Sequence, residues 1–274
     1  MKKGGVIGRN IQHSLSPMIH NHSFLSAGLD YVYEIFDWEE SEFSENLPRL
    51  RQPDFFGANV TMPYKEAVIP FLDKISDRAE RIGAVNTIVN IRGQLIGENT
   101  DGEGFILATR SFFQGLLGKK VVVLGAGGAA KAVVSALVEH HAEVVVVSRT
   151  GANFQKMVAR IGKERVLTFK SFEGENKEYH LLRDADLIVN ATNSGMSYEK
   201  SLVDFSKLSN NKLCVMDLIY SPEETHFLQQ AKANGLRAKN GLDMLVFQAS
   251  LAFTLWTGVE MDVPLIQNKL KGNL

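Results

Sequence analysis

The sequence predicts an α/β protein with two domains, the second of them built on a doubly wound parallel sheet. The first observation is a glycine-rich turn at residues 125–130, which directly follows the apolar run Val121-Val122-Val123-Leu124. The second is the alternation of strand-like and helix-like stretches on both sides of this turn, which is typical of α/β folds. The third is the position of the turn in the middle of 274 residues, which leaves room for a separate domain before it.

The residues before the turn alternate between predicted strands and helices, so the first domain is expected to be α/β as well. Strands are predicted over 6–8, 31–36, 55–60, 85–90 and 94–96. Helices are predicted over 17–28, with Pro17 in the first turn, and over 39–47, before Pro48. A short helix is expected to start at Pro63, and a longer helix, 102–116, leads to the second domain.

The second domain has the strand and helix pattern of a doubly wound sheet. Its predicted strands are 121–124, 143–147, 165–169, 186–190, 213–217 and 236–239, and its first helix is 129–140. An apolar helix, 243–257, follows and is expected to pack in a cleft or against the first domain. The expected organisation is a first domain of residues 1–103, a second of residues 104–240, and a C-terminal helical segment, 241–274, that returns to the first.

The composition is that of an ordinary globular protein. Hydrophobic residues make up 45% of the chain, and the formal net charge is −1, which leaves no electrostatic footprint for nucleic acid or an anionic membrane. The longest apolar segment, 244–256, is too short and too polar to span a bilayer, and no signal peptide is recognisable. We therefore expect a cytoplasmic protein that binds neither membranes nor nucleic acid, as a monomer or a homodimer.

Cysteine and histidine usage gives no sign of a metal site or a thiol nucleophile. The single cysteine, Cys214, lies in an apolar run and is predicted to be a buried strand residue. Of the seven histidines, His20 and His22 lie two residues apart, and no cysteine or acidic cluster accompanies them. Both are expected to lie along a helix.

The glycine-rich turn has the residues that a dinucleotide site requires. Gly125 allows a sharp turn out of the strand, Gly127 lets a pyrophosphate approach the backbone, and the small Ala130 lets the next helix sit close to the sheet. Unpaired N–H groups at the start of that helix then face the phosphates. The turn predicts a Rossmann-type domain, with an ordinary glycine-rich turn as the alternative. The cofactor-binding residues expected here are Gly125, Ala126, Gly127, Gly128 and Ala129.

The residues after the second strand of this domain favour NADP over NAD. An NAD site usually has an acidic residue about 20 positions beyond the glycines, bonded to the ribose 2′-hydroxyl. This chain has Ser148-Arg149-Thr150 there. A carboxylate would repel a 2′-phosphate, whereas Arg149 offers a planar fork of donors and its neighbours offer hydroxyls. The alternative is that Arg149 is a solvated arginine at a strand end.

Four segments of the first domain place polar side chains where predicted strands end. They are His13-Ser14-Leu15-Ser16-Pro17, Asn59-Val60-Thr61-Met62-Pro63-Tyr64-Lys65, Gly83-Ala84-Val85-Asn86-Thr87 and Asn99-Thr100-Asp101-Gly102. Ligands of open α/β sheets gather beyond the carboxyl ends of strands, so these segments are expected to converge on one cleft. Their hydroxyls and amides suit a carboxylate and several ring hydroxyls, and the residues expected to bind them are Ser14, Ser16, Asn59, Thr61 and Asn86.

Lys65 and Asp101 form the ionisable pair of these segments and are predicted to exchange a proton with a substrate oxygen. Structural alternatives exist for each residue. The serines before Pro17 could cap a helix, Lys65 could be a solvated charge, and Asp101 could belong to a turn or a cap. Structural roles alone explain less readily why the serines, Lys65 and Asp101 all occur in one chain.

The chain resembles the shikimate dehydrogenases over nearly its whole length. The resemblance is carried by the four polar segments, the glycine turn, Asn190-Ala191-Thr192 and Gln248. It implies a reversible, NADPH-dependent reduction of 3-dehydroshikimate to shikimate in aromatic amino acid biosynthesis. By resemblance, Lys65 and Asp101 are the catalytic pair. Ser14 and Ser16 would bind the substrate carboxylate, and the ring hydroxyls would be bound by Thr61, Asn86, Tyr220 and Gln248. The resemblance also assigns to the cofactor site Thr192, Asn193, Leu218 and Gly241.

One residue departs from the family pattern. Members often have a second arginine three residues after the threonine of the Ser148-Arg149-Thr150 position, and this chain has Asn153 there, with Lys156 as a possible substitute. This departure leaves the margin of NADP over NAD open. Two related activities are also alternatives: a quinate/shikimate dehydrogenase that prefers NAD, and a folate-type methylene dehydrogenase, which has no reason to carry Ser14-Leu15-Ser16-Pro17. A non-catalytic NADP-sensing protein is the alternative of another class, and it has no need of a proton relay.

The cofactor interpretation is tested by Arg149→Ala. Loss of charge-assisted hydrogen bonds, each contributing about 1.5 to 3 kcal/mol, should raise the KM for NADPH by about tenfold or more and leave the KM for NADH nearly unchanged. Steady-state kinetics with both cofactors measures this. An equal loss for NADPH and NADH would contradict the assignment of Arg149 to the 2′-phosphate.

Overall fold

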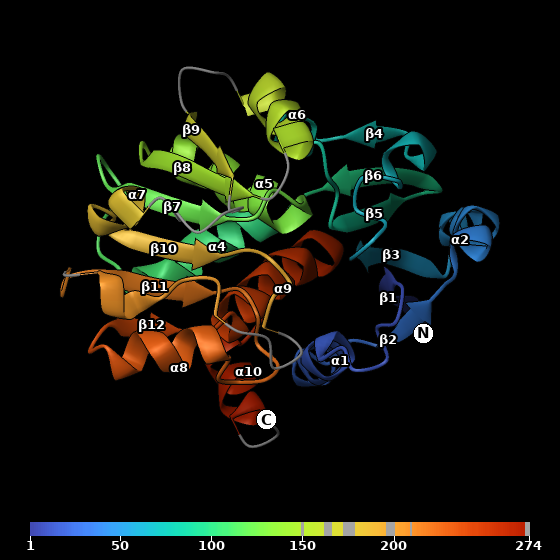
Figure 1. Cartoon of the computed structure of the whole chain (residues 1–274). Coiled ribbons are helices and arrows are strands. Elements are labelled where there is room, and N and C mark those ends of the chain that lie inside the picture. The colour runs from blue at the N-terminus through green and yellow to red at the C-terminus, as the bar shows by residue number, and fades with distance from the viewer. Residues whose placement is uncertain (149–150, 162–165, 172–178, 196–200, 209, 272–274) are drawn as a thin grey trace. The chain divides into compact units, whose positions relative to one another are not determined.

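The chain folds into two compact units. The computed structural model describes residues 1–148, 151–161, 166–171, 179–195, 201–208 and 210–271. Unit 1 contains residues 1–104 together with the C-terminal segment that begins at Val246, and unit 2 contains residues 105–245. The chain passes from unit 1 into unit 2 within helix α4 (Asp101–Arg110) and returns within helix α9 (Leu242–Thr257). Each unit has its own six-stranded sheet (Figure 1).

The sheet of unit 1 is mixed, with the strand order β2-β1-β3-β5-β6-β4. Its strands are β1 (Lys2–Gly8), β2 (Tyr31–Asp37), β3 (Phe55–Val60), β4 (Lys74–Ile75), β5 (Thr87–Ile91) and β6 (Gln94–Glu98). Strand β1 runs parallel to both β2 and β3, whereas β5 is antiparallel to β3 and β6. The carboxyl ends of β1, β2 and β3 therefore lie at one edge of the sheet, where polar segments can meet.

Helix α1 of unit 1 was predicted from the sequence, whereas helix α3 was not, although its ends carry common capping residues. Helix α1 (Ser16–Ser26) has Pro17 in its first turn, and α3 (Asp77–Ile82) is capped by the Ser76 side chain and ends at Gly83, which has a φ of +71°. The other helical segments are α2 (Glu40–Asn46), η1 (Leu47–Arg51), η2 (Ile69–Phe71) and α10 (Val263–Leu270). His20 and His22 lie on α1, which confirms their predicted place on a helix.

Two predicted helices were wrong: one is shorter than predicted, and the other is absent from the described residues. The helix predicted over 102–116 ends at Arg110, because the Lys239 ammonium binds the Ala108 carbonyl oxygen at 3.3 Å and the chain then turns. No helix starts at Pro63, where residues 62–68 form turns. The carbonyl oxygen of Lys65 there accepts from the N–H of Val85 at 2.8 Å, a long-range bond in place of a helical one.

The sheet of unit 2 is parallel throughout, with the order β12-β11-β10-β7-β8-β9, and Figure 1 shows these strands side by side. They are β7 (Lys120–Leu124), β8 (Glu143–Ser148), β9 (Val166–Ser171), β10 (Leu187–Asn190), β11 (Cys214–Asp217) and β12 (Arg237–Lys239). The order reverses between β7 and β10, whose ends Leu124 and Asn190 are paired. The predicted doubly wound sheet is thus confirmed, and its switch point lies beside the glycine turn.

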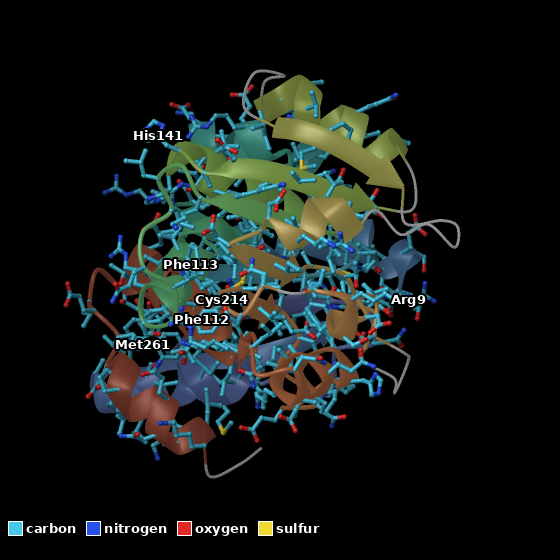
Figure 2. All side chains as sticks on the ribbon, turned by 60° about the vertical axis from the view of Figure 1, so that its left-hand side comes forward. Arg9, Phe112, Phe113, His141, Cys214 and Met261 are labelled. Carbon is cyan, nitrogen blue, oxygen red and sulfur yellow. The ribbon has the colours of Figure 1, made fainter. Side chains whose placement is uncertain are left out.

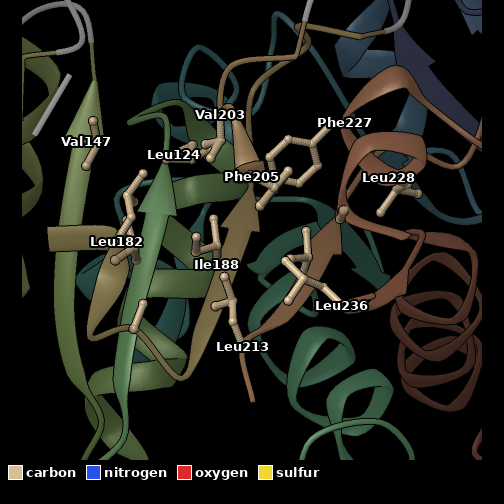
Figure 3. Packing of buried hydrophobic residues seen from close by; sticks show 14 of the residues in the cluster. Leu124, Val147, Leu182, Ile188, Val203, Phe205, Leu213, Phe227, Leu228 and Leu236 are labelled. Atoms are coloured by element: carbon tan, nitrogen blue, oxygen red, sulfur yellow. The ribbon is translucent and has the colours of Figure 1, made fainter. Parts of the chain in front are cut away.

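The apolar runs of these strands are buried among helices on the sheet faces. The helices are α5 (Gly128–Glu139), α6 (Gly151–Ile161), α7 (Tyr179–Arg183) and α8 (His226–Ala233), with a short 3-10 turn, η3 (Phe205–Lys207). Figure 3 shows one core of this unit, in which Leu124 and Ile188 of the sheet pack with Phe205 and Phe227. Within the described part of the chain, no helix has the length and apolar character to cross a membrane.

Cys214 is fully buried at the start of β11, which confirms its predicted place in a strand. Arg237 of the neighbouring strand donates to the Cys214 Sγ at 3.1 Å and to the Phe112 carbonyl oxygen at 3.3 Å, and so links the two residues. Figure 2 labels both Cys214 and Phe112. Burial raises the pKa of the Cys214 thiol, with Arg237 opposing in part. A thiol held in this protonated state is a poor nucleophile.

Asp217, at the end of β11, is a fully buried carboxylate that joins three elements of unit 2. Its Oδ1 accepts from Asn190 Nδ2 at 3.0 Å and from the N–H of Ile219 at 3.1 Å, and its Oδ2 accepts from Thr225 Oγ1 at 2.6 Å. Thr225 in turn caps α8. Burial raises the pKa of Asp217 from 3.8 to about 6, despite these hydrogen bonds.

Asp217→Asn should change how the free energy of unfolding depends on pH. The carboxyl ionises near pH 3.8 in the unfolded chain and near 6 in the folded one, so its contribution to stability is present at low pH and lost as pH rises through 6. Between pH 5 and pH 7, the wild type should lose about 1 kcal/mol relative to Asp217→Asn. Urea unfolding followed by circular dichroism measures this, with the exposed Asp184→Asn as control. Parallel pH curves for Asp217→Asn and the wild type would contradict it.

His20 should act in the opposite direction over the same pH range. Its ring is fully buried against Tyr33, Phe24 and Trp256, and neither ring nitrogen has a hydrogen-bond partner among the described residues. Burial lowers the pKa of His20 from 6.5 to about 3, and the Asn59 side chain opposes this only in part. The neutral ring therefore contributes stability above pH 6.5 that is lost as pH falls toward 3.

His20→Phe keeps an aromatic ring in this position and removes the titration. Between pH 7 and pH 5, the wild type should lose about 2 kcal/mol more stability than His20→Phe. Urea unfolding followed by the fluorescence of Trp38 and Trp256, both in unit 1, measures the difference. His22→Phe, on the same helix, controls for the loss of a histidine. The same loss of stability in His20→Phe and the wild type would show that His20 does not titrate in this way.

Candidate active site

The loop after β1 carries the two predicted carboxylate ligands, and Asp37 holds it in place. Asp37 ends β2 opposite Gly8 and accepts from the N–H of Asn10 at 2.7 Å, from the N–H of Ile11 at 3.2 Å and from Gln12 Nε2 at 3.2 Å. The N–H of Ser14 bonds to the Ile11 carbonyl oxygen at 2.9 Å. One carboxylate thus determines the path of the chain toward Ser14.

Ser14 and Ser16 are close together at the start of α1. The N–H of Ser16 donates to Ser14 Oγ at 3.3 Å, whereas the N-cap residue of α1 is Leu15 and has no side-chain cap bond. The hydroxyl hydrogen of Ser14 is not used in that bond. Ser16 is buried and Ser14 is half-buried. The predicted alternative, a serine side chain that caps α1, is therefore not what the structure shows.

Lys65 and Asp101 form an ion pair, with 2.5 Å between Lys65 Nζ and Asp101 Oδ2. Their side chains are only 15% and 7% exposed. Lys65 lies in the turns after β3, and Asp101 is the first residue of α4, where the helix dipole favours a negative charge. A pair this close and this buried interacts strongly, because little water screens the two charges. The arrangement can hold a proton next to a bound oxygen and release it.

Asn86 is the centre of the hydrogen bonds around this pair. Its Nδ2 donates to Asp101 Oδ1 at 2.8 Å and to Thr100 Oγ1 at 2.9 Å, and Gln248 Oε1 lies at 3.3 Å. Its Oδ1 accepts from the N–H of Thr100 at 2.8 Å and from Thr87 Oγ1 at 2.9 Å. Asn86 therefore bonds the Asp101 oxygen that is not paired with Lys65.

Gln248 reaches the cluster because α4 and α9 approach closely at Gly104. A Cβ at Gly104 would lie 2.7 Å from the backbone nitrogen of Gln248 and 2.8 Å from its Cβ. No larger residue fits there without moving α9. Gln248, predicted to bind substrate, is thus joined to Asn86, which lies more than a hundred positions earlier in the chain.

Thr61 and Asn59 lie at the end of β3, but they differ in what they have to offer a ligand. Thr61 is half-buried, with its N–H bonded to the Ile7 carbonyl oxygen at 2.8 Å. Asn59 is buried, and its Nδ2 donates to the Asn86 carbonyl oxygen at 3.2 Å and to Thr87 Oγ1 at 3.1 Å. Both amide hydrogens of Asn59 are therefore used inside the protein.

In unit 2 the glycine turn leaves its backbone open to a ligand. Gly125 has a φ of +109°, and a Cβ there would lie 2.9 Å from Thr192 Cγ2, so both conformation and space require glycine. A Cβ at Gly127 would meet no atom within 4 Å. Helix α5 starts at Gly128 with Gly127 as its N-cap residue. An exposed backbone followed by a helix N-terminus is suited to a pyrophosphate.

The segments after β10 and β11 are held beside this turn by hydrogen bonds. Asn190 is fully buried and accepts from Thr192 Oγ1 at 2.7 Å, and Thr192 Oγ1 accepts from the N–H of Ser194 at 3.1 Å. The next residue, Asn193, is exposed. Asn190 and Asp217 support these segments, and sequence reasoning did not assign either to the site. A polar residue at the end of a buried strand is the signal that could have found them.

Leu218 and Gly241, both predicted to line the nicotinamide site, are in close contact. A Cβ at Gly241 would lie 2.0 Å from the Leu218 carbonyl oxygen, so only glycine fits at residue 241. Tyr220, two residues after Leu218, is half-buried, and burial raises its pKa. Ser148 ends β8 and is buried, whereas Arg149 and Thr150 lie outside the described residues. Lys156 is exposed on α6.

The arrangement fits a dinucleotide in unit 2 and a polar, acidic small molecule in unit 1. Unit 1 places a buried proton-holding pair beside amides and hydroxyls, and unit 2 has an open glycine turn at the switch point of its sheet. Across the described ranges, no group of three or more histidine, cysteine or acidic side chains is placed to hold a metal ion.

Three family models match the chain. The shikimate dehydrogenase substrate binding domain matches residues 6–88, the shikimate / quinate 5-dehydrogenase model matches residues 107–221, and the shikimate 5′-dehydrogenase C-terminal domain matches residues 241–271. The first match includes Ser14, Lys65 and Asn86, and the second includes the glycine turn.

Known proteins similar to this chain are named shikimate dehydrogenases. It is 41% identical over 261 residues to the shikimate dehydrogenase (NADP(+)) of Streptococcus pneumoniae (strain JJA), covering 93% of this chain and 91% of that protein. The shikimate 5-dehydrogenase of Listeria monocytogenes, solved with shikimate and NAD, has a TM-score of 0.91 at 33% identity, covering 98% of this chain and 96% of that one. The shikimate 5-dehydrogenase of Thermus thermophilus, solved with NADP(H) and shikimate, has a TM-score of 0.89 at 37% identity, covering all of both chains.

Proposed function

The chain belongs to the shikimate dehydrogenase family, and from this premise we propose how its own residues perform the reaction. It is an NADP-dependent oxidoreductase that interconverts 3-dehydroshikimate and shikimate. The observation that carries the proposal is the buried Lys65–Asp101 ion pair, bordered by Asn86 and Gln248 in unit 1. These four residues supply a proton and three polar groups at one place.

In the proposed mechanism, Lys65 and Asp101 move the proton. NADPH, when bound, supplies the hydride that reduces the 3-keto carbon. The Lys65 ammonium gives its proton to the substrate oxygen as negative charge develops there, and Asp101 stabilises the charged lysine beforehand. In the direction of shikimate oxidation, the same pair takes the proton of the 3-hydroxyl. Asn86 keeps Asp101 oriented through the bond to its Oδ1.

The substrate is proposed to lie between the serine loop and the ion pair. Ser14 and Ser16 bind the carboxylate. Two observations support this: Asp37 holds their loop, and the bond that Ser14 Oγ accepts from the Ser16 N–H leaves the Ser14 hydroxyl hydrogen unused. The ring hydroxyls are bound by Thr61, Asn86, Tyr220 and Gln248. Asn59, also predicted to bind substrate, retains only acceptor capacity, because both of its amide hydrogens are donated within the protein.

The residues of unit 2 fit the cofactor. The open backbone at Gly127 and the start of α5 at Gly128 would hold the pyrophosphate, with Gly125, Ala126 and Ala129 shaping the turn. Thr192, Asn193, Leu218 and Gly241 would line the rest of the site. Ser148, Arg149 and Thr150 would bind the 2′-phosphate. We also propose that residues 1–103 form the substrate domain and 104–240 the NADP domain, with 241–274 returning to the first, in a cytoplasmic monomer or homodimer.

One assay tests this function. NADP⁺ with shikimate at alkaline pH should give a rise in NADPH absorbance, and replacing shikimate by quinate, or NADP⁺ by NAD⁺, should give a slower one. No NADPH formed from shikimate would reject the proposal. Faster turnover with quinate and NAD⁺ would favour a quinate-type enzyme. This arm of the assay is included because the similar Listeria protein was solved with NAD.

Lys65→Ala tests the catalytic pair. A positioned proton donor contributes about 10² to 10⁴ in rate, so kcat should fall at least about 100-fold while the affinity for shikimate stays nearly unchanged. Lys74→Ala, an exposed lysine of the same unit, is the matched control and should keep full activity. Circular dichroism checks that both variants fold, because Lys65→Ala leaves a buried carboxylate without its partner. Retention of most turnover by Lys65→Ala would exclude Lys65 as the proton donor.

A further inference from the structure

Tyr33 is a buried tyrosine of β2 that the mechanism above does not use. Its side chain is 2% exposed, and its hydroxyl donates to Asn59 Oδ1 at 2.6 Å. Burial raises the pKa of Tyr33 well above its usual value of 10.0, and hydrogen bonds with Ser16 and Asn59 oppose this only in part. The hydroxyl therefore stays protonated and remains a donor over the working pH range.

Helix α1 holds Tyr33 in this position from two sides. Asn21 bonds both backbone groups of Tyr33: its Nδ2 donates to the Tyr33 carbonyl oxygen at 2.9 Å, and its Oδ1 accepts from the Tyr33 N–H at 2.9 Å. The preceding residue, His20, stacks on the Tyr33 ring with 4.4 Å between centroids. A tyrosine held by its backbone and its ring has little freedom to move its hydroxyl.

The Tyr33 hydroxyl and the Asn86 carbonyl oxygen together determine which way round the Asn59 amide lies. The oxygen and nitrogen ends of an amide have nearly the same shape, so hydrogen bonds alone distinguish the two orientations. With Oδ1 facing Tyr33, the Nδ2 of Asn59 faces Thr87 Oγ1 at 3.1 Å and the Asn86 carbonyl oxygen at 3.2 Å. Without the hydroxyl, the donor that holds the Oδ1 end in place is lost.

The hydrogen bonds that follow all run in one direction toward the ion pair. Thr87 Oγ1 accepts from Asn59 and donates to Asn86 Oδ1 at 2.9 Å, and Asn86 Nδ2 donates to Asp101 Oδ1 at 2.8 Å. A reversed Asn59 would present an acceptor to Thr87, whose single hydrogen would then turn away from Asn86. The Thr100 N–H and the Thr87 hydroxyl both hold Asn86 Oδ1, and the contribution of Thr87, which supports the donor to Asp101, depends on Tyr33.

We propose that Tyr33 is a positioning residue for the reaction, which sets the direction of the hydrogen-bond chain Tyr33–Asn59–Thr87–Asn86 and so orients the amide that bonds Asp101. This inference rests on the proposed function, because it assigns Tyr33 an effect on the Lys65–Asp101 pair. Tyr33 acts through Asn59 and Asn86. Its hydroxyl proton is donated to Asn59 and is not exchanged with the substrate.

Tyr33→Phe removes the hydroxyl and keeps the ring. We expect kcat for shikimate oxidation to fall about tenfold, the effect of one buried hydrogen bond, while the KM for NADP⁺ stays unchanged. Tyr31→Phe is the matched control, because Tyr31 lies two residues away on the same face of β2 and packs on Phe24 and Phe56. Active sites are counted by NADP⁺ binding, so that a lower folded fraction does not lower kcat. Equal kcat for the two variants would overturn the inference.

Thr87→Val tests whether Tyr33 acts through this chain of hydrogen bonds. Valine has the shape of threonine without the hydroxyl, so this variant alone should also lower kcat about tenfold. The double variant Tyr33→Phe/Thr87→Val should lose no more than either single variant, because both break the same chain. A double variant whose loss is the product of the two, about a hundredfold, would show independent effects and overturn the inference.

A measurement without turnover separates this inference from the proposed function. The side-chain amide resonances of Asn86 in ¹H–¹⁵N spectra should shift in Tyr33→Phe and stay in place in Tyr31→Phe. Unchanged resonances in both would overturn the inference, whatever the activity. A wild-type protein that forms no NADPH from shikimate would reject the proposed function, and the Asn86 resonances would still decide whether Tyr33 orients that amide.

Discussion

The buried ion pair between Lys65 and Asp101 is the interaction on which the rest of the site in unit 1 depends. Removing two charges from water is costly, and the cost is offset only if the charges are close and their remaining polar groups are bonded. The separation of 2.5 Å meets the first condition, and the bond from Asn86 to Asp101 meets the second. The buried amides and hydroxyls nearby therefore serve the pair first, and the exposed side of the pair is left for a substrate.

Unit 2 meets a different constraint, which is the close approach of backbone segments at the switch point of a parallel sheet. Gly125 and Gly241 lie where any side chain would collide with the segments after β10 and β11. Buried Asn190 and Asp217 hold those segments by bonding loop N–H groups and hydroxyls, in place of water. Open space at Gly127 within such a tightly held region is what gives a dinucleotide access to the backbone.

Much of the fold was predictable, because strands with apolar, β-branched runs such as 121–124 and 143–147 carry their signal locally. The missed elements include the short helices α3, α7, α8 and α10 and the two-residue strand β4, which carry too few residues for a clear pattern. The end of α4 was misplaced because Lys239, far along the chain, binds its last turn. In the site, polar residues at strand ends and the pairing of Lys65 with Asp101 could be predicted from the sequence, but the hydrogen-bond partners of Asn59 and Asn86 could not.

By itself, the sequence determined the two-part α/β organisation, the glycine turn with its cofactor and the residue types available for chemistry. These follow from hydrophobic period, from glycine at positions that exclude side chains and from motifs of neighbouring residues. Only the tertiary structure decided that Asn59 donates to the Asn86 carbonyl oxygen, that Asp37 holds the serine loop and that the Tyr33 hydroxyl bonds Asn59. Hydrogen-bond direction depends on which distant groups meet, and Tyr33, Asn59 and Asn86 meet only after the four strands β2, β1, β3 and β5 have paired.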